Sequence, residues 1–104
     1  MGAIDVWAQI TTPRMADQPW MKTLLRWTGQ ENDRPLPTPA STVAAMDVAG
    51  IDISLISAWS SPQGDLISND EVDAQIGAAP TRLRGLACVD LNSPMEAVRE
   101  IRRR

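Results

Sequence analysis

The residues of this chain that could take part in ligand chemistry are concentrated in its opening stretch, IDVWAQI, residues 4–10. Polar and apolar side chains alternate there, so on a β-strand Asp5, Trp7 and Gln9 fall on one face. An indole can stack on a substrate ring and a glutamine amide can donate a hydrogen bond, which makes Trp7 and Gln9 candidates for substrate binding. The alternative is that Trp7 fills a cavity and Gln9 bonds to neighbouring backbone. Asp5 lies one layer deeper, and we interpret it as a hydrogen-bonded structural carboxylate rather than a general base.

The apolar side chains of the same stretch fall on the opposite face of the strand. We expect this apolar face to meet helices. The face that carries Trp7 and Gln9 is then expected to point into whatever the sheet encloses.

The chain offers few residues that could act as a nucleophile or a general base, because it contains no histidine and a single cysteine, Cys88. A nucleophilic cysteine needs a partner base, so we interpret Cys88 as a buried small hydrophobe within an apolar strand. A lone cysteine cannot form an internal disulfide and fits a reducing compartment, which favours the cytoplasm. The chain has no Gly-rich phosphate loop and no paired-cysteine metal motif. The residues therefore identify no catalytic side chain and no metal ligand.

Two further candidates follow apolar runs later in the chain. Trp59 stands just before Ser60-Ser61-Pro62 and is the third candidate for substrate binding, the alternative being packing under that loop. Asp90 stands near the end of the next run, and its neighbours Asn92 and Ser93 favour capping or loop hydrogen bonding over catalysis.

Size and charge limit the function classes. A chain of 104 residues forms at most one small domain, and 43% apolar residues with a net charge of -3 indicate neither disorder nor nucleic-acid binding. No apolar run approaches the ~20 residues that cross a bilayer. The N-terminus has no basic region followed by an apolar core, so no secretory signal is indicated and we expect no membrane partner.

The strands that must position these side chains are expected at about residues 3–10, 51–59 and 83–91. Each is a short apolar or alternating run that is bounded by turn-forming residues.

Helices are predicted between these strands. Apolar spacing predicts one over residues 17–28, where Trp20 and Trp27 form part of a cover, a subunit contact or the core. A second begins at Thr38 with Pro39 in its first turn and ends at Gly50. Capping boxes at Ser68 and Ser93 predict two more, the last with Ala97, Val98 and Ile101 on its buried face.

Strands separated by capped helices predict right-handed crossovers and a parallel α/β sheet. Three parallel strands with open edges make a poor free-standing domain, whereas a complete eight-stranded barrel takes about 250 residues. We therefore predict that residues 1–104 are parallel βα units from the N-terminal part of a TIM-type (β/α)8 barrel. The alternative is a complete chain whose sheet edges pair in an oligomer.

Four strings together resemble the amidohydrolase-related family, the branch of the metal-dependent amidohydrolases that includes aminocarboxymuconate-semialdehyde decarboxylase-like enzymes. They are IDVWAQI, MDVAGIDISLIS, SNDEV and PTRLRGLACVDLNSPMEAVREI. The similarity spans nearly the whole chain but only the N-terminal part of that family's domain. It implies a distorted β/α barrel that uses zinc or another divalent metal for hydrolysis or non-oxidative decarboxylation.

The resemblance also implies a departure at the first strand. Two metal-binding histidines of the family fall on Trp7 and Gln9, and neither replacement is a good zinc ligand. We therefore expect no metal or other cofactor within this segment, and no activity from these 104 residues alone.

The function that the resemblance implies is an amidohydrolase-related hydrolase or decarboxylase acting on a small carboxylate or aromatic acid. The alternative is a non-catalytic barrel or partner subunit that binds ligand or protein through Trp7 and Trp59. The expected partners are a small-molecule carboxylate and either a second copy of the chain or the remainder of the barrel.

Overall fold

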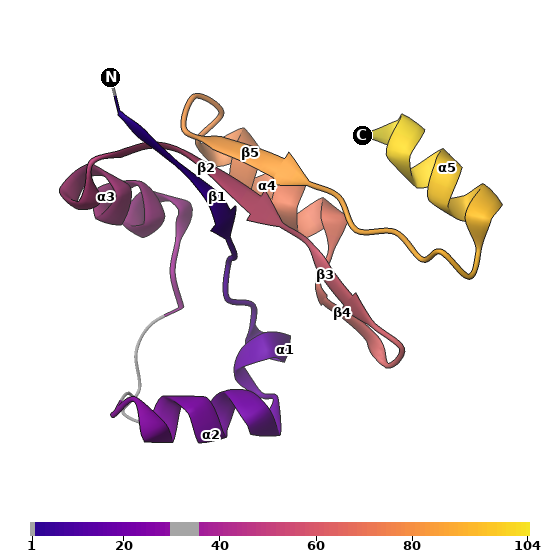
Figure 1. Ribbon diagram of the computed structural model, residues 1–104, viewed down its shortest axis with the longest axis horizontal. Coiled ribbons are helices and arrows are strands. Elements are labelled where there is room, and N and C mark those ends of the chain that lie inside the picture. The colour runs from indigo at the N-terminus through magenta and orange to yellow at the C-terminus, as the bar shows by residue number, and fades with distance from the viewer. Residues whose placement is uncertain (1, 30–35) are drawn as a thin grey trace.

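The computed structural model describes residues 2–29 and 36–104 of the chain (Figure 1). Residues 30–39 are polar and contain three prolines, which predicts a loop, and part of this predicted loop lies outside the described residues. Helices and strands follow one another along the chain in this order: β1 (Ala3–Ala8), α1 (Pro13–Ala16), α2 (Pro19–Trp27), α3 (Pro39–Ala49), β2 (Ile51–Ser57), β3 (Trp59–Ser61), β4 (Gly64–Ile67), α4 (Asn69–Ala78), β5 (Leu83–Leu86) and α5 (Pro94–Arg103).

Three of the strands form a parallel sheet in the order β1-β2-β5 (Figure 1). Its central strand places Ile56 opposite Ala8 of β1 and Gly85 of β5. Helix α3 connects β1 to β2, and α4 lies between β2 and β5, so the expected βα connections are present. The prediction of an α/β fold with parallel strands is confirmed.

The strand predicted over residues 51–59 is too long. β2 ends at Ser57, and Trp59 begins a separate antiparallel hairpin, β3–β4. The turn of this hairpin contains Pro62 and Gly64, whose φ of 128° favours glycine. Ala58 and Trp59 extend the apolar run past Ser57, so the sequence pattern does not mark the end of β2.

The strand predicted over residues 83–91 is also too long, because β5 ends at Leu86. Beyond it, the backbone N–H of Cys88 donates to Oδ1 of Asn69 at 2.9 Å, and its carbonyl accepts from Nδ2 of the same residue at 2.9 Å. A side chain thus takes the place of a strand partner. The first strand is likewise shorter than expected and ends at Ala8.

Most of the predicted helix ends are confirmed. Thr38 caps α3 by accepting from the backbone N–H of Ser41 at 3.1 Å, and Gly50 closes it with a φ of 73°. Ser68 and Glu71 form the expected capping box at α4. Ser93 is the N-cap residue of α5 as predicted, but the capping box expected there is wrong. Its side chain makes no cap hydrogen bond, and its ψ of 73° departs from the extended value of 164° at Thr38. The short helix α1 was not predicted.

The core lies on the face of the sheet that α3 and α4 cover. Ile56 and Leu83 are 1% and 0% exposed, and they pack with Met46 of α3 and Val72 of α4. A Cβ at Gly85 would lie 2.9 Å from Val72 Cγ1, so β5 and α4 approach closely there. No helix of the described residues is long and apolar enough to cross a membrane.

The expectation that the apolar face of the first strand meets helices is confirmed at Ile10, which is buried in the core with Met15 of α1, but it is wrong at Ile4 and Val6. Ile4 and Val6 are 60% and 67% exposed, whereas Asp5 and Gln9 line a cavity together with Met46 of α3. β1 is an edge strand, and its pairing with β2 is irregular between Ala3 and Ile4 and again between Asp5 and Ala8. These irregularities break the strict alternation that the sequence pattern assumed.

On the final helix only Ala97 is buried. Val98 and Ile101, which the sequence predicts on its buried face, are exposed. The C-terminal end of this helix contacts α4 through polar side chains instead: Glu100 accepts from Asn69, and Arg104, which follows the helix, pairs with Asp70 and Asp73.

Candidate functional site

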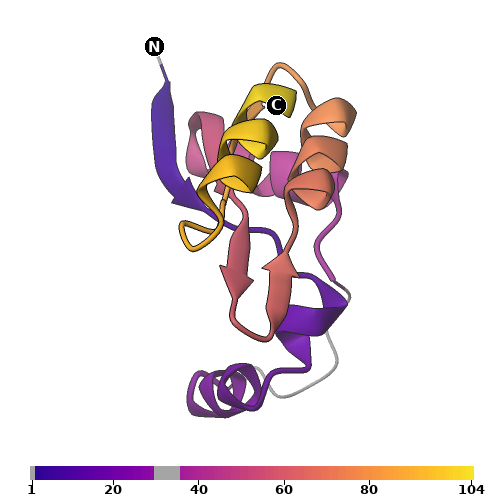
Figure 2. The ribbon, with the colours of Figure 1, turned by 90° about the vertical axis from the view of Figure 1, so that its right-hand side faces the viewer.

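Three connections meet at the carboxyl end of the parallel strands. α1 and α2 follow β1, the β3–β4 hairpin follows β2, and residues 87–92 follow β5. Figure 2 shows the hairpin beside α1 and α2 at this end of the molecule. In parallel α/β sheets, side chains that bind ligands stand on connections of this kind.

Trp7 lies within β1 and is 79% exposed. Its backbone N–H donates to Oδ1 of Asp5 at 3.0 Å, which agrees with the interpretation of Asp5 as a hydrogen-bonded structural carboxylate. Among the described residues, the indole of Trp7 is therefore an exposed aromatic surface. The carboxylate of Asp5 accepts a hydrogen bond from the backbone.

Gln9 lies just beyond the end of β1 and lines a cavity of about 710 Å³ between the sheet and α3. Asp5 and Ser54 contribute from the sheet, and the rest of the lining comes largely from α3 and the residues before it. Trp7 does not line this cavity, and neither does Trp59. The structure thus places the three candidates Trp7, Gln9 and Trp59 in separate surroundings.

Trp59 stands on the hairpin and faces α2. Its ring centroid lies 5.5 Å from that of Trp20, with 47° between the ring planes. The two rings are 37% and 41% exposed and border an open cavity of about 750 Å³. Its lining combines the ends of α1 and α2 with the hairpin: Arg14, Asp17, Gln18, Trp20, Trp59, Ser61, Gln63, Gly64, Asp65 and Leu66. We call this cavity the Trp groove.

Arg14 fixes the hairpin against α1. Its Nε donates to the carbonyl of Asp65 at 3.0 Å, and its Nη2 forms an ion pair with Glu71. Burial raises the pKa of Glu71, but hydrogen bonds from the backbone and side chain of Ser68 and the charge of Arg14 outweigh it and hold the pKa below its ordinary value. Thr12 donates to the carbonyl of Leu66 at 2.5 Å, so two side chains from the β1 connection hold β4.

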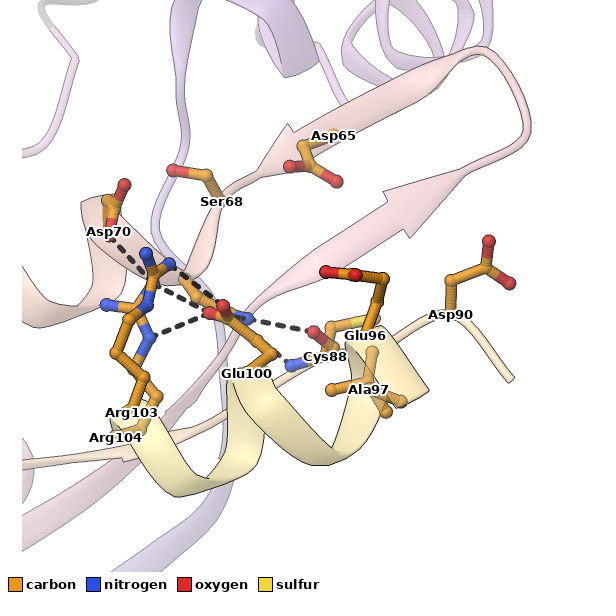
Figure 3. A pocket seen from close by; sticks show the side chains of 12 residues that line it. Asp65, Ser68, Asp70, Cys88, Asp90, Glu96, Ala97, Glu100, Arg103 and Arg104 are labelled. Carbon is orange, nitrogen blue, oxygen red and sulfur yellow. Dashed lines mark hydrogen bonds and ion pairs between the residues drawn. The ribbon is translucent and has the colours of Figure 1, made fainter. Parts of the chain in front are cut away.

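A second hydrogen-bonded cluster lies where α5 meets the start of α4 (Figure 3). Asn69 Nδ2 donates to Glu100 Oε1 at 2.9 Å as well as to Cys88, and Arg104 pairs with Glu100, Asp70 and Asp73. The hydrogen bonds from Asn69 and Arg104 lower the pKa of Glu100. The cavity beside this cluster measures about 300 Å³.

The sequence analysis missed Asn69. One feature of the sequence could have indicated its role. Asparagine is a poor helix former, yet Asn69 follows the Ser68 cap as the first residue of a helix, a position where its side chain is expected to form a local hydrogen bond. Nothing in the sequence indicates that its partner is nineteen positions away at Cys88.

Cys88 is half-buried, and its Sγ lies 3.3 Å from Ser60 Oγ. It follows β5 rather than lying inside it, so the expected fully buried position within a strand is wrong. Asp90 Oδ1 accepts from the backbone N–H of Asn92 at 2.9 Å, which confirms the predicted loop hydrogen bonding.

The donor chemistry at the first strand does not suit a divalent metal. The indole nitrogen of Trp7 carries its hydrogen and cannot ligate, and the amide oxygen of Gln9 is a weak ligand for zinc. In the part of the chain that the structure describes, no three histidine, cysteine, aspartate or glutamate residues are grouped so that they could hold a metal ion. No step of a reaction is therefore assigned to a metal held by these residues.

Neither a scan against protein-family models nor a search of curated proteins found a match to this chain. Among solved structures, the chain is similar to a dihydroxybenzoic acid decarboxylase from Polaromonas sp. JS666, determined with bound manganese and the inhibitor 2-nitroresorcinol. The TM-score is 0.60 and the sequence identity 23%, over 98% of this chain and 34% of that one. The chain thus spans about a third of the decarboxylase, and it shares the fold of the N-terminal part of that TIM barrel.

Proposed function

We propose that this chain forms the first βα units of an amidohydrolase-like barrel that acts on a small carboxylate or aromatic acid as a decarboxylase or hydrolase. The observation that carries the proposal is the fold similarity, which extends over 98% of the chain and involves a decarboxylase of an aromatic acid. The four strings that resemble the amidohydrolase-related family support the same assignment from the sequence.

The roles that we assign to this segment are binding roles. Trp7 presents an exposed indole on β1, which can cover one face of a substrate ring. Gln9, at the carboxyl end of β1, can donate its amide hydrogens to a carboxylate. Trp59 borders the Trp groove on the next connection of the same end. Catalytic groups and any metal ligands would have to come from outside these 104 residues.

A further part of the proposal concerns what completes the sheet. β1 and β5 are its outer strands, and Ile4 and Leu86 are exposed on the face opposite the core. Additional βα units of the same barrel would pair with both edges and cover that face. Pairing with a second copy of the chain is the alternative, and a cytoplasmic location stays a prediction from the lone cysteine.

The second candidate function is a non-catalytic barrel that binds a ligand or protein. It is favoured by the replacement of both first-strand histidines by Trp7 and Gln9, which removes imidazole donors without introducing other strong metal ligands.

The deciding experiment is elemental analysis of the longest native product of this reading frame, purified without a histidine tag, together with an assay for carbon dioxide release from a dihydroxybenzoate. We expect about one bound divalent metal per chain and turnover, with residues 1–104 alone giving neither. A folded product that contains no metal and releases no carbon dioxide would contradict the enzyme proposal and favour the binding scaffold. Trp7→Leu should weaken substrate binding in the active product, and Trp27→Leu, on exposed α2 surface, is its control.

A further inference from the structure

The β3–β4 hairpin that carries Trp59 is irregular beside this residue. Trp59 pairs with Ile67 of β4. The next residue of β3, Ser60, pairs with Asp65, which leaves Leu66 as an extra residue on β4. Two residues opposite one define a β-bulge, which interrupts the ladder, increases the local twist and redirects neighbouring side chains. The bulge therefore helps to set the direction in which the Trp59 indole leaves the hairpin.

The hairpin lies beside α1 (Figure 2), and two side chains from the start of that helix bond to the backbone at the bulge. Thr12 Oγ1 donates to the carbonyl of Leu66 at 2.5 Å, and Arg14 Nη2 donates to the same carbonyl at 3.4 Å. Arg14 Nε donates to the carbonyl of Asp65 at 3.0 Å. Buried backbone carbonyls need donors, and an interrupted ladder supplies fewer of them. Thr12 and Arg14 thus act as donors that stabilise the bulged conformation of β4.

Thr12 is itself held in place. It is 4% exposed, and its Oγ1 accepts from the backbone N–H of Met15 at 3.2 Å while it donates to Leu66. Because the side chain is buried, water does not readily replace these bonds when the hydroxyl is removed. One hydroxyl therefore links the first turn of α1 to the bulge.

Arg14 extends this link to the start of α4. Its Nη2 pairs with Glu71, and the Glu71 carboxylate also accepts from the backbone N–H of Ser68 at 3.0 Å. Ser68 follows β4 directly. The guanidinium thus holds the chain on both sides of Ile67, which is 1% exposed in the core. These bonds restrict movement of β4 relative to α1.

The same short segment also positions the second ring of the pair. Only a short turn separates α1 from α2, and within it the Gln18 backbone N–H donates to the carbonyl of Met15 at 3.2 Å. Trp20 stands in the first turn of α2, and its ring centroid lies 5.5 Å from that of Trp59. Residues 12–14 therefore act on both rings, through α1 on Trp20 and through the bulge on Trp59.

We propose that Thr12 and Arg14 are positioning residues that fix the indole of Trp59 against Trp20. They act through the hairpin backbone: their hydrogen bonds hold the bulged segment of β4, and the bulge directs Trp59 toward α2. An aromatic side chain that is held in place before a ligand arrives loses less freedom on binding. The inference rests on the proposed function where that function gives Trp59 a contact with substrate, whereas the geometry of the ring pair belongs to the fold alone.

The ring pair can be followed by circular dichroism of the longest native product. Two indoles whose centroids lie 5.5 Å apart with tilted planes couple electronically and give paired positive and negative bands in the far ultraviolet. The signal of this pair is the part of the spectrum that Trp20→Phe and Trp59→Phe each remove. The absence of such a common signal would overturn the proposal, because the rings would not then be paired.

Two variants test the positioning residues. Thr12→Val removes the hydroxyl with little change in shape, and Arg14→Met removes the guanidinium from a side chain that is 51% exposed. We expect both variants to unfold cooperatively in a calorimeter but to lose most of the ring-pair signal. Thr12→Ser keeps the hydroxyl and should restore the signal, although serine fills the buried site less well than valine, so a role in packing alone predicts the opposite order. Arg26→Met, the same change on α2, is the control and should leave the signal unchanged.

Kinetics connect the ring pair to the proposed function. In an active product, Thr12→Val and Arg14→Met should each raise KM for the dihydroxybenzoate about fivefold and leave kcat within about twofold, since displacing Trp59 removes a binding contact and no reacting group. Full retention of the ring-pair signal in either folded variant would overturn the proposal, whatever the turnover. A product that shows no turnover but loses the signal in both variants would contradict the proposed function and leave the positioning role of Thr12 and Arg14 standing.

Discussion

The two faces of the three-stranded sheet are covered very differently. On the face toward α3 and α4, Ile56 and Leu83 are almost fully buried, whereas on the opposite face Ile4 and Leu86 keep 60% and 45% of their surface exposed. Both faces are apolar, so composition does not cause the difference. The helices of the βα units cover only the outer face of a barrel, and the inner face is covered only when the sheet closes on itself.

The largest expected effect tests this contrast directly. Ile56→Ala should lower the free energy of unfolding by about 3 kcal/mol, because it leaves a cavity beneath α3 and α4. Leu86→Ala on the open face should cost less than about 1 kcal/mol. Urea denaturation of each purified variant measures both values.

Equal losses of unfolding free energy in Ile56→Ala and Leu86→Ala would mean that something covers the open face in solution. Repeating the denaturation at two protein concentrations would identify self-association, since only a dimer or larger assembly changes its midpoint with concentration.

A smaller effect is expected where β5 and α4 approach most closely. A Cβ at Gly85 would lie 2.7 Å from Ile76 Cδ1 and 2.9 Å from Val72 Cγ1, and the valine is stiff at χ1. Gly85→Ala should therefore cost about 1–2 kcal/mol through overpacking. Gly77 lies in α4, and a Cβ there would have no atom within 4 Å. Gly77→Ala should therefore raise the free energy of unfolding by about 0.5–1 kcal/mol. The melting temperatures of the two variants should move in opposite directions, and a parallel shift would contradict the close packing.

The smallest expected change in stability concerns the N-terminal cap of α4. Ser68→Ala removes the acceptor for the backbone N–H of Glu71, a 3.1 Å bond, and should cost about 1 kcal/mol. Ser93→Ala removes no cap hydrogen bond from α5 and should change stability by no more than about 0.5 kcal/mol. Thermal unfolding of both variants checks the difference, and similar losses would show that Ser93 caps its helix in solution.

The order of the main strands and helices could be predicted because local signals mark it. Thr38, Pro39 and Gly50 delimit one helix, and Ser68 with Glu71 starts another, since caps act over three or four residues. The end of the sheet strand at Ser57 could not be predicted, because Ala58 and Trp59 follow it directly and extend the apolar run. Whether Ser93 caps its helix depends on a backbone angle that the residue types do not determine.

The candidate site was less predictable than the fold. The sequence makes Trp59 a candidate for ligand binding, but its neighbour Trp20 is 39 positions away, and the sequence leaves a cover, a subunit contact and the core open for that residue. The alternation that grouped Trp7 with Gln9 assumed a regular strand, and β1 is irregular where it pairs with β2. Contacts between distant connections depend on tertiary packing, which short sequence patterns do not encode.

The bonds of Asn69 restrict which side chains that position can accept. Its amide gives one acceptor to the N–H of Cys88 and two donor bonds, to the carbonyl of Cys88 and to Glu100. Aspartate has the same shape but no donors, and it would place a second negative charge beside Glu100. Leucine would remove the side-chain partner of both backbone groups of Cys88 and one hydrogen bond to Glu100, which would keep its bond from Arg104. Glutamine would be one methylene too long. In a saturation-mutagenesis map, position 69 would therefore stand out as intolerant although it is only half-buried and lies in the first turn of a helix.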